Sequence, residues 1–209
     1  VPMLVVSPWS KGGWLCSETY DHTSIIRFIG RRFGKAGSRD LSEPNITPWR
    51  HAICGDLTRA FDFAHPNAAF PALPVTTGYV PPDKTRHADY VPVPPLVQAK
   101  PNQEPGVRPA RTLPYELFVR SHVEAAQHAL RIEFINTGSA GAAFLVYRAR
   151  SLDAPRSYAV EAKKRIADTL VLPIDGRYDY TVYGPNGLMR RFSGAVVPDA
   201  ASGWNAGAA

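Results

Sequence analysis

Four consecutive residues, Asp21, His22, Thr23 and Ser24, have side chains that suit phosphate chemistry, and they lie where a glycine-bearing loop enters a predicted helix over 24–33. Asp21 or Thr23 can cap this helix by accepting the free N–H groups of its first turn. A helix start favours a phosphate group, and an imidazole such as His22 can bind a phosphoryl oxygen or move a proton. We predict that Asp21 and His22 line a catalytic crevice and that Thr23 and Ser24 contact substrate. The alternative is that Asp21 and Thr23 only cap the helix while His22 packs under the loop.

Three aromatic residues, Trp9, Trp14 and Tyr20, precede that helix within the same loop. Aromatic faces attract cations, including quaternary ammonium groups, by about 0.5–2 kcal/mol each. The sequence therefore predicts that the three rings contribute to binding a cationic substrate group. The alternative is that they pack the loop onto the core.

The elements that must position these residues are also visible in the sequence. An apolar run at 4–6 predicts a buried strand ahead of the loop, and Gly34 can end the helix that follows it. Thr47 and Pro48 predict the N-cap and first residue of a second helix, and 56–63 predicts a further short helix. Residues 1–70 thus resemble an α/β unit whose site lies beyond a core strand.

The rest of the chain divides into three further zones. Residues 71–114 hold 11 of the 20 prolines and predict an extended connector, and residues 197–209 predict a flexible tail. Residues 115–196 alternate apolar and polar residues between turn signals, which is typical of an antiparallel sandwich. The predicted strands span 115–121, 129–136, 142–150, 156–161, 166–172, 177–183 and 188–196.

The composition restricts the classes of partner and of site that this chain can have. The net charge is +6 without a run of five basic residues, which favours a mildly basic protein over a nucleic-acid binder. No apolar run approaches the 18 residues of a membrane span. Cys16 and Cys54 have no metal-ligand spacing, so they are either two free thiols or a disulfide pair. No metal-ligating residue is predicted in this chain.

Several long motifs carry a family resemblance. VPMLVVSPWSKGGW at 1–14, CSETYDHTSIIRF at 16–28 and EPNITPWRHAICGDLTRAFDF at 43–63 resemble bacterial phosphocholine-specific phospholipases C, which are related to acid phosphatases. The family's C-terminal β domain is similar to the second half of the chain. The matching segments there are LPYEL at 113–117, INTGSAGAAFLVY at 135–147, YAVEA at 158–162 and RYDYTVYGPNG at 177–187.

This resemblance implies a fold, an activity and a partner. It implies that residues 1–70 are the tail of an alkaline-phosphatase-like α/β catalytic domain, followed by a β-sandwich. It also implies a secreted or periplasmic enzyme that cleaves phosphatidylcholine or sphingomyelin at a membrane surface. The family motifs with the nucleophile and most metal ligands do not occur in this sequence, and Val1 opens directly into the apolar run. We therefore expect an upstream catalytic region in the same enzyme, with any divalent metal held mostly there, and an isolated chain that is inactive.

Two other functions remain open at this stage. The chain is alternatively a non-catalytic β-sandwich module that binds lipid or another surface, or a relative of the acid phosphatases. Exposed apolar surface on residues 1–63 would favour part of an enzyme, whereas a closed N-terminal zone would favour an independent module.

Overall fold

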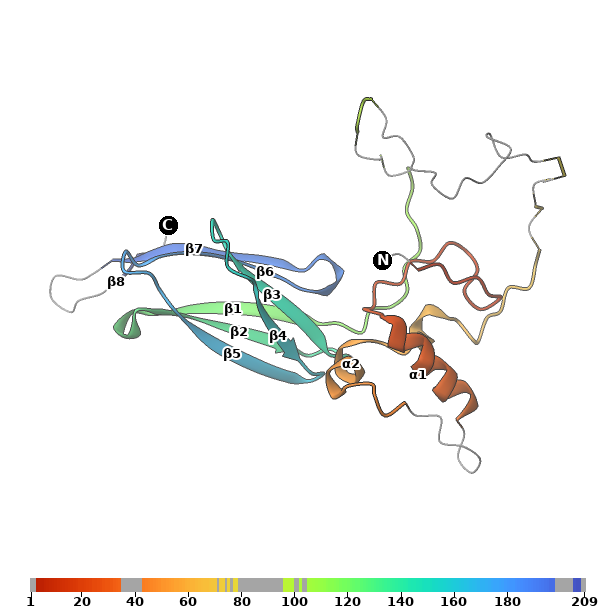
Figure 1. Cartoon of the computed structure of the whole chain (residues 1–209), viewed down its shortest axis with the longest axis horizontal. Coiled ribbons are helices and arrows are strands. Elements are labelled where there is room, and N and C mark those ends of the chain that lie inside the picture. The colour runs from red at the N-terminus through yellow and green to blue at the C-terminus, as the bar shows by residue number, and fades with distance from the viewer. Residues whose placement is uncertain are drawn as a thin grey trace.

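The computed structural model describes residues 3–34, 43–70, 72–73, 75, 77–78, 96–99, 102, 105–197 and 205–207. Most of its regular structure is β, in two antiparallel sheets beside a small helical region (Figure 1). The three-stranded sheet has the order β1-β2-β5, and the five-stranded sheet has the order β4-β3-β6-β7-β8. The strands are β1 Leu117–Glu124, β2 Ala129–Asn136, β3 Ala142–Arg148, β4 Arg156–Val160, β5 Lys164–Val171, β6 Arg177–Tyr183, β7 Met189–Val197 and β8 Asn205–Gly207.

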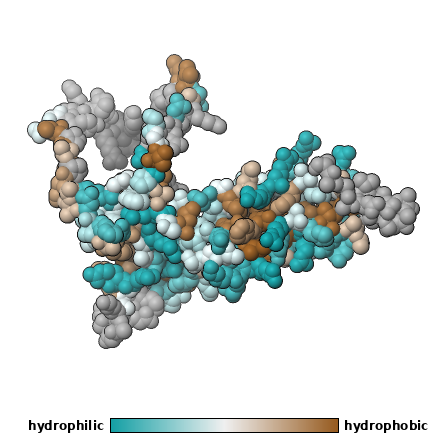
Figure 2. Space-filling model, turned by 180° about the vertical axis from the view of Figure 1, so that it is seen from behind, coloured by the Kyte–Doolittle hydropathy of each residue, from teal (hydrophilic) through white to brown (hydrophobic). Residues whose placement is uncertain are grey.

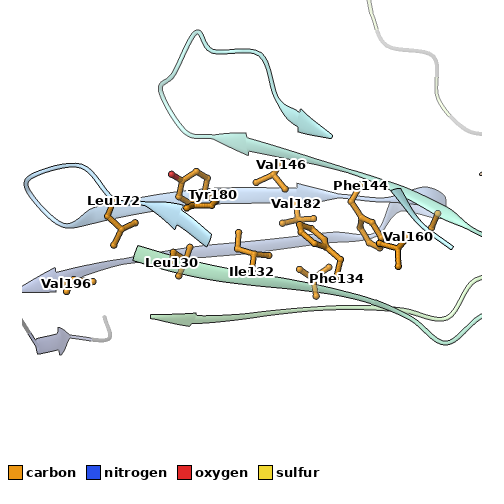
Figure 3. Close-up of a cluster of buried hydrophobic side chains, with 13 residues drawn as sticks. Leu130, Ile132, Phe134, Phe144, Val146, Val160, Leu172, Tyr180, Val182 and Val196 are labelled. Atoms are coloured by element: carbon orange, nitrogen blue, oxygen red, sulfur yellow. The ribbon is translucent and has the colours of Figure 1, made fainter. Parts of the chain in front are cut away.

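The two sheets enclose a hydrophobic core between them. Alternate residues of a strand share one face, so Leu130, Ile132 and Phe134 of β2 all enter this core. Phe144 of β3 meets Phe134 with ring centroids 5.2 Å apart, and both side chains are fully buried. Figure 3 shows these residues between the strands of the two sheets. The prediction of an antiparallel β domain is therefore confirmed.

A buried asparagine links the ends of the two sheets. Asn136 is 1% exposed, and its Nδ2 donates to the carbonyls of Ala140, Val160 and Glu161 at 2.8, 3.1 and 3.2 Å. Its Oδ1 accepts the N–H of Gly138 at 3.0 Å. Because a buried amide is costly unless it is bonded, this satisfied side chain fixes the turn after β2 against the end of β4.

A second polar contact joins the edge strands β4 and β5. Tyr158 donates its hydroxyl to Asp168 Oδ2 at 2.5 Å, while its ring stacks on Phe134 at a centroid distance of 4.5 Å. Burial and this bond to the carboxylate raise the pKa of Tyr158 to about 12. The phenol therefore stays protonated and can keep donating across the open edge of the sandwich.

The helical region contains α1 His22–Phe33, α2 Pro48–Ile53 and the 3-10 turn η1 Thr58–Ala60. Two further 3-10 turns, η2 Ala125–Gln127 and η3 Pro185–Gly187, lie between strands of the β domain. Thr47 caps α2 by accepting the N–H of Arg50, as predicted, and Pro48 is its first residue. The N–H of Gly34 donates to the carbonyl of Gly30 and ends α1, as predicted.

Two predicted elements of this region are wrong. Residues 4–6 form no strand, and Leu4 and Val6 are each 87% exposed. A short apolar run becomes a strand only beside a partner, and within the described residues of 3–70 the one β contact is a bridge from Leu15 to Ala110. The helix predicted over 56–63 is only the three-residue turn η1, because Leu57 has a left-handed φ of 67° that interrupts a helix.

Candidate functional site

The start of α1 is built as a reciprocal cap. Asp21 Oδ1 accepts the backbone N–H of Thr23 at 2.8 Å and its hydroxyl at 2.6 Å. Ser24 Oγ accepts the backbone N–H of Asp21 at 3.1 Å in return. Thr23 is 6% exposed and Ser24 is fully buried. Both hydroxyls are thus engaged in the cap, while their predicted contact with substrate stays a prediction.

The Asp21 carboxylate also joins the two helices. Its Oδ2 forms an ion pair with Arg50 of α2. Burial raises the pKa of Asp21, but the bonds from Thr23 and Arg50 outweigh that effect and hold the pKa at about 2, below the ordinary 3.8. Asp21 is therefore an anion near neutral pH that fixes the helix start, and it is poorly suited to carry a catalytic proton there.

His22, by contrast, is exposed and faces a cavity. It is the first residue of α1, and its ring has no hydrogen bond within the described part of the chain. The cavity measures about 1440 Å³ and is also lined by Asp21, Trp14 and Tyr20. An imidazole placed on a fixed helix start beside such a cavity can bind or protonate an oxygen of a ligand.

The three aromatic residues do not form a common cage. Trp9 does not line this cavity, and its ring lies 6.1 Å from Phe63 between centroids. Trp14 does line the cavity, but the guanidinium of Arg111 already lies over its ring at 4.3 Å. Tyr20 lines the cavity beside His22, with its hydroxyl turned to other residues of the loop. The structure thus brings Trp14, Tyr20 and His22 to one cavity and places Trp9 elsewhere.

A buried carboxylate in this loop was missed by sequence reasoning. Glu18 has a side chain only 6% exposed and accepts the Tyr20 hydroxyl at 2.7 Å. Burial raises the pKa of Glu18, with Arg59 opposing it from 3.6 Å. The Glu18 carboxyl lies so close to Gly55 that a Cβ there would stand 2.5 Å from its Cδ. Tyr20 lies in the same loop, but Gly55 and Arg59 come from another segment, so no local spacing in the sequence signals the cluster.

Both cysteines are free thiols. Cys16 Sγ lies 3.3 Å from the Tyr20 hydroxyl, and Cys54 is buried at the end of α2. Burial raises the pKa of the Cys54 thiol, which therefore stays protonated and unreactive at neutral pH. The disulfide alternative is thus excluded in this structure.

The described residues offer no metal-binding group of three or more His, Cys, Asp or Glu side chains. None of the described helices has the length and apolar character needed to cross a bilayer.

Comparison with known families defines the class of the protein. Residues 1–35 match the phosphoesterase family, and residues 109–195 match the bacterial phospholipase C, C-terminal domain. The segment that contains α1 and His22 thus matches one family model, and the β domain matches the other. The class is a phosphoesterase segment followed by a phospholipase C C-terminal domain.

Individual relatives agree with this class. The chain is 53% identical over 201 residues to a non-hemolytic phospholipase C of Burkholderia pseudomallei, covering 94% of this chain and 28% of that protein. It is 48% identical over 212 residues to a non-hemolytic phospholipase C of Pseudomonas aeruginosa, covering 96% and 28%. A hemolytic phospholipase C of P. aeruginosa is 36% identical over 225 residues, covering 93% and 30%. The chain corresponds to the C-terminal portion of bacterial phospholipases C and spans under a third of the length of these relatives.

Proposed function

We propose that this chain is the C-terminal part of a secreted phospholipase C that hydrolyses the phosphodiester of phosphatidylcholine or sphingomyelin and releases phosphocholine. The proposal rests above all on the similarity to phospholipases C along nearly the whole chain. The nucleophile belongs to an upstream catalytic region, of which residues 1–70 are the α/β tail. The isolated chain is therefore inactive.

Exposed apolar surface in the helical region supports this proposal. Ile25, Ile26, Ile29 and Phe33 of α1 are 48%, 41%, 47% and 64% exposed, although an amphipathic helix normally buries such residues. Leu4 and Val6 are exposed as well, and exposed apolar surface of this kind is what a further protein layer would cover. Part of a larger enzyme fits this surface better than a closed, independent module does.

Within this proposal His22 contacts the substrate phosphoryl group, as hydrogen-bond donor or proton carrier. Asp21 acts through the helix start that it caps, while Trp14 and Tyr20 shape the wall of the same cavity. These roles suit hydrolysis of a phosphodiester, because a positioned donor stabilises charge that develops on the phosphoryl oxygens.

A non-catalytic lipid- or surface-binding module is the second candidate. One observation favours it: the β domain buries a complete core of its own between its two sheets. Hydrophobic residues still appear as patches on the surface of the β domain (Figure 2). On this alternative, removal of His22 would leave function unchanged.

The experiment replaces the matching C-terminal part of the B. pseudomallei relative with this chain and measures hydrolysis of a chromogenic phosphocholine ester. We expect His22→Ala to lower kcat/KM of this chimera by more than about tenfold, which is about 1.4 kcal/mol of barrier. His65→Ala is the matched control, since His65 is exposed and bonded to Asp62. An unchanged rate in a stably folded His22→Ala chimera would reduce His22 to a structural residue.

A further inference from the structure

The loop that leads to His22 is held by residues that come shortly before β1. The N–H of Leu15 donates to the carbonyl of Pro109 at 2.9 Å, and Leu15 accepts the N–H of Arg111 at 2.8 Å. These two bonds form a parallel bridge between Leu15 and Ala110. The Arg111 guanidinium also lies over the Trp14 ring, 4.3 Å from its centroid. Residues 109–111 therefore fix the loop at Trp14 and Leu15.

A tyrosine fixes the loop again, closer to the site. The hydroxyl of Tyr115 accepts the backbone N–H of Thr19 at 2.8 Å, two residues before Asp21. The Tyr115 ring packs against the core of the β domain. On the other side, Thr19 accepts the N–H of Gly55 at 2.9 Å. Thr19 is thus clamped between the helical region and a side chain anchored in the β domain.

A third contact joins the turn after β2 to α2. The N–H of Gly141 donates to the carbonyl of Ala52 at 3.0 Å, and a Cβ at Gly141 would stand 2.3 Å from that oxygen. Arg59 donates to the hydroxyl of Ser139 at 3.2 Å. Asn136 fixes this turn from inside the β domain. The contact with α2 is therefore made by a turn that is itself held in place. Only a glycine permits such a close approach.

We propose that the β domain acts as a brace, which means that it holds in place the loop leading to His22. In this brace Tyr115 is a positioning residue, because its bond to Thr19 places His22. The inference rests on the proposed role of His22. It gives the C-terminal domain a part in catalysis that needs no contact with substrate. A displacement of the reacting groups by about 1 Å is enough to cost about a hundredfold in rate, so a bond that fixes the loop can affect turnover.

The first test measures amide hydrogen exchange of Thr19 in the 209-residue chain. Tyr115→Phe removes the acceptor and keeps the ring, so we expect Thr19 to exchange about tenfold faster, with the stability of the β domain little changed. Tyr183→Phe is the matched control, because it removes the same atom from an exposed residue of β6. Tyr158→Phe is the second control, because it removes a partly buried, hydrogen-bonded hydroxyl within the β domain alone.

Thr19 exchange at the wild-type rate in Tyr115→Phe would overturn the brace. So would an equal acceleration in Tyr158→Phe, since that would reveal general destabilisation rather than a local clamp.

The second test measures kcat and KM of the phospholipase chimera carrying Tyr115→Phe. We expect kcat to fall several-fold while KM and Tm stay close to those of the parent, and Tyr183→Phe to change none of them. If His22→Ala is slow but Tyr115→Phe has normal kcat, the brace is wrong and the proposed function stands. If Thr19 exchanges faster in Tyr115→Phe but His22→Ala turns over normally, the brace holds the loop and the proposed role of His22 fails.

Discussion

The β domain and the helical region differ in how they bury their apolar side chains. In the β domain, Leu130, Phe134, Phe144 and Val182 are completely buried between two sheets. In the helical region, α1 exposes most of its apolar residues, and the buried ones are few and lie mainly around α2 and η1. One region therefore carries its own source of stability, whereas the other depends on contacts beyond its own residues.

The candidate site and the main hydrophobic core therefore lie in different regions of the chain. The candidate site residues, His22 above all, lie on the region with the weaker core. Contacts from the stronger region at Thr19 and Ala52, and from residues 109–111 at Leu15, hold that region in place. On the function proposed above, the β domain would supply rigidity and the helical region would supply one wall of the active site.

The largest expected effect comes from replacing one phenylalanine by alanine in each of the two regions. Phe134→Ala removes a fully buried ring and should cost about 3–5 kcal/mol of unfolding free energy, because a cavity remains between the sheets. Phe33→Ala removes a ring that is 64% exposed and should change stability by less than about 0.5 kcal/mol. Denaturant unfolding of the 209-residue chain measures both changes. Similar losses of unfolding free energy at the two positions would contradict the difference between the regions.

A smaller effect concerns the charge that fixes the helix start. The pKa of Asp21 is lowered to about 2 from 3.8, so its carboxylate stabilises the fold at any pH above about 4, and this contribution is lost as the pH falls from about 4 to about 2. Asp21→Asn should therefore weaken α1 by about 1–2 kcal/mol at pH 7, and the difference from the wild type should disappear near pH 2.

Amide exchange across α1 as a function of pH measures this effect. Asp153→Asn, which removes a charge from an exposed loop, is the control and should leave α1 unchanged at every pH. If α1 of Asp21→Asn stayed less stable than wild-type α1 by the same amount down to pH 2, the role of the charge would be contradicted.

The sequence predicted the β domain far better than the site. The predicted strands at 129–136 and 177–183 coincide with β2 and β6, because alternating residues between turn signals define strands locally. The end strand β8 lies within 197–209, which was predicted as a flexible tail, since three small or polar residues carry no strand pattern. The cap of α1 by Asp21 was also predictable, because capping depends on neighbouring residues.

The contacts that organise the site were not predictable in this way. The Asp21–Arg50 ion pair joins residues 29 apart in sequence, and the Thr19–Tyr115 bond joins residues 96 apart. Such pairs depend on how the elements pack and leave no periodic signal. The predicted strand at 4–6 failed for a related reason, since an apolar run does not reveal whether a neighbouring strand is present.

The most direct measurement compares the 209-residue chain with the chimera in which it completes the B. pseudomallei relative, using one phosphocholine ester assay. The account predicts no turnover by the isolated chain, with or without divalent metal, and turnover by the chimera within about tenfold of the parent enzyme. Turnover by the isolated chain, or a folded chimera without activity, would contradict the claim that this chain is the C-terminal wall and brace of a phospholipase C.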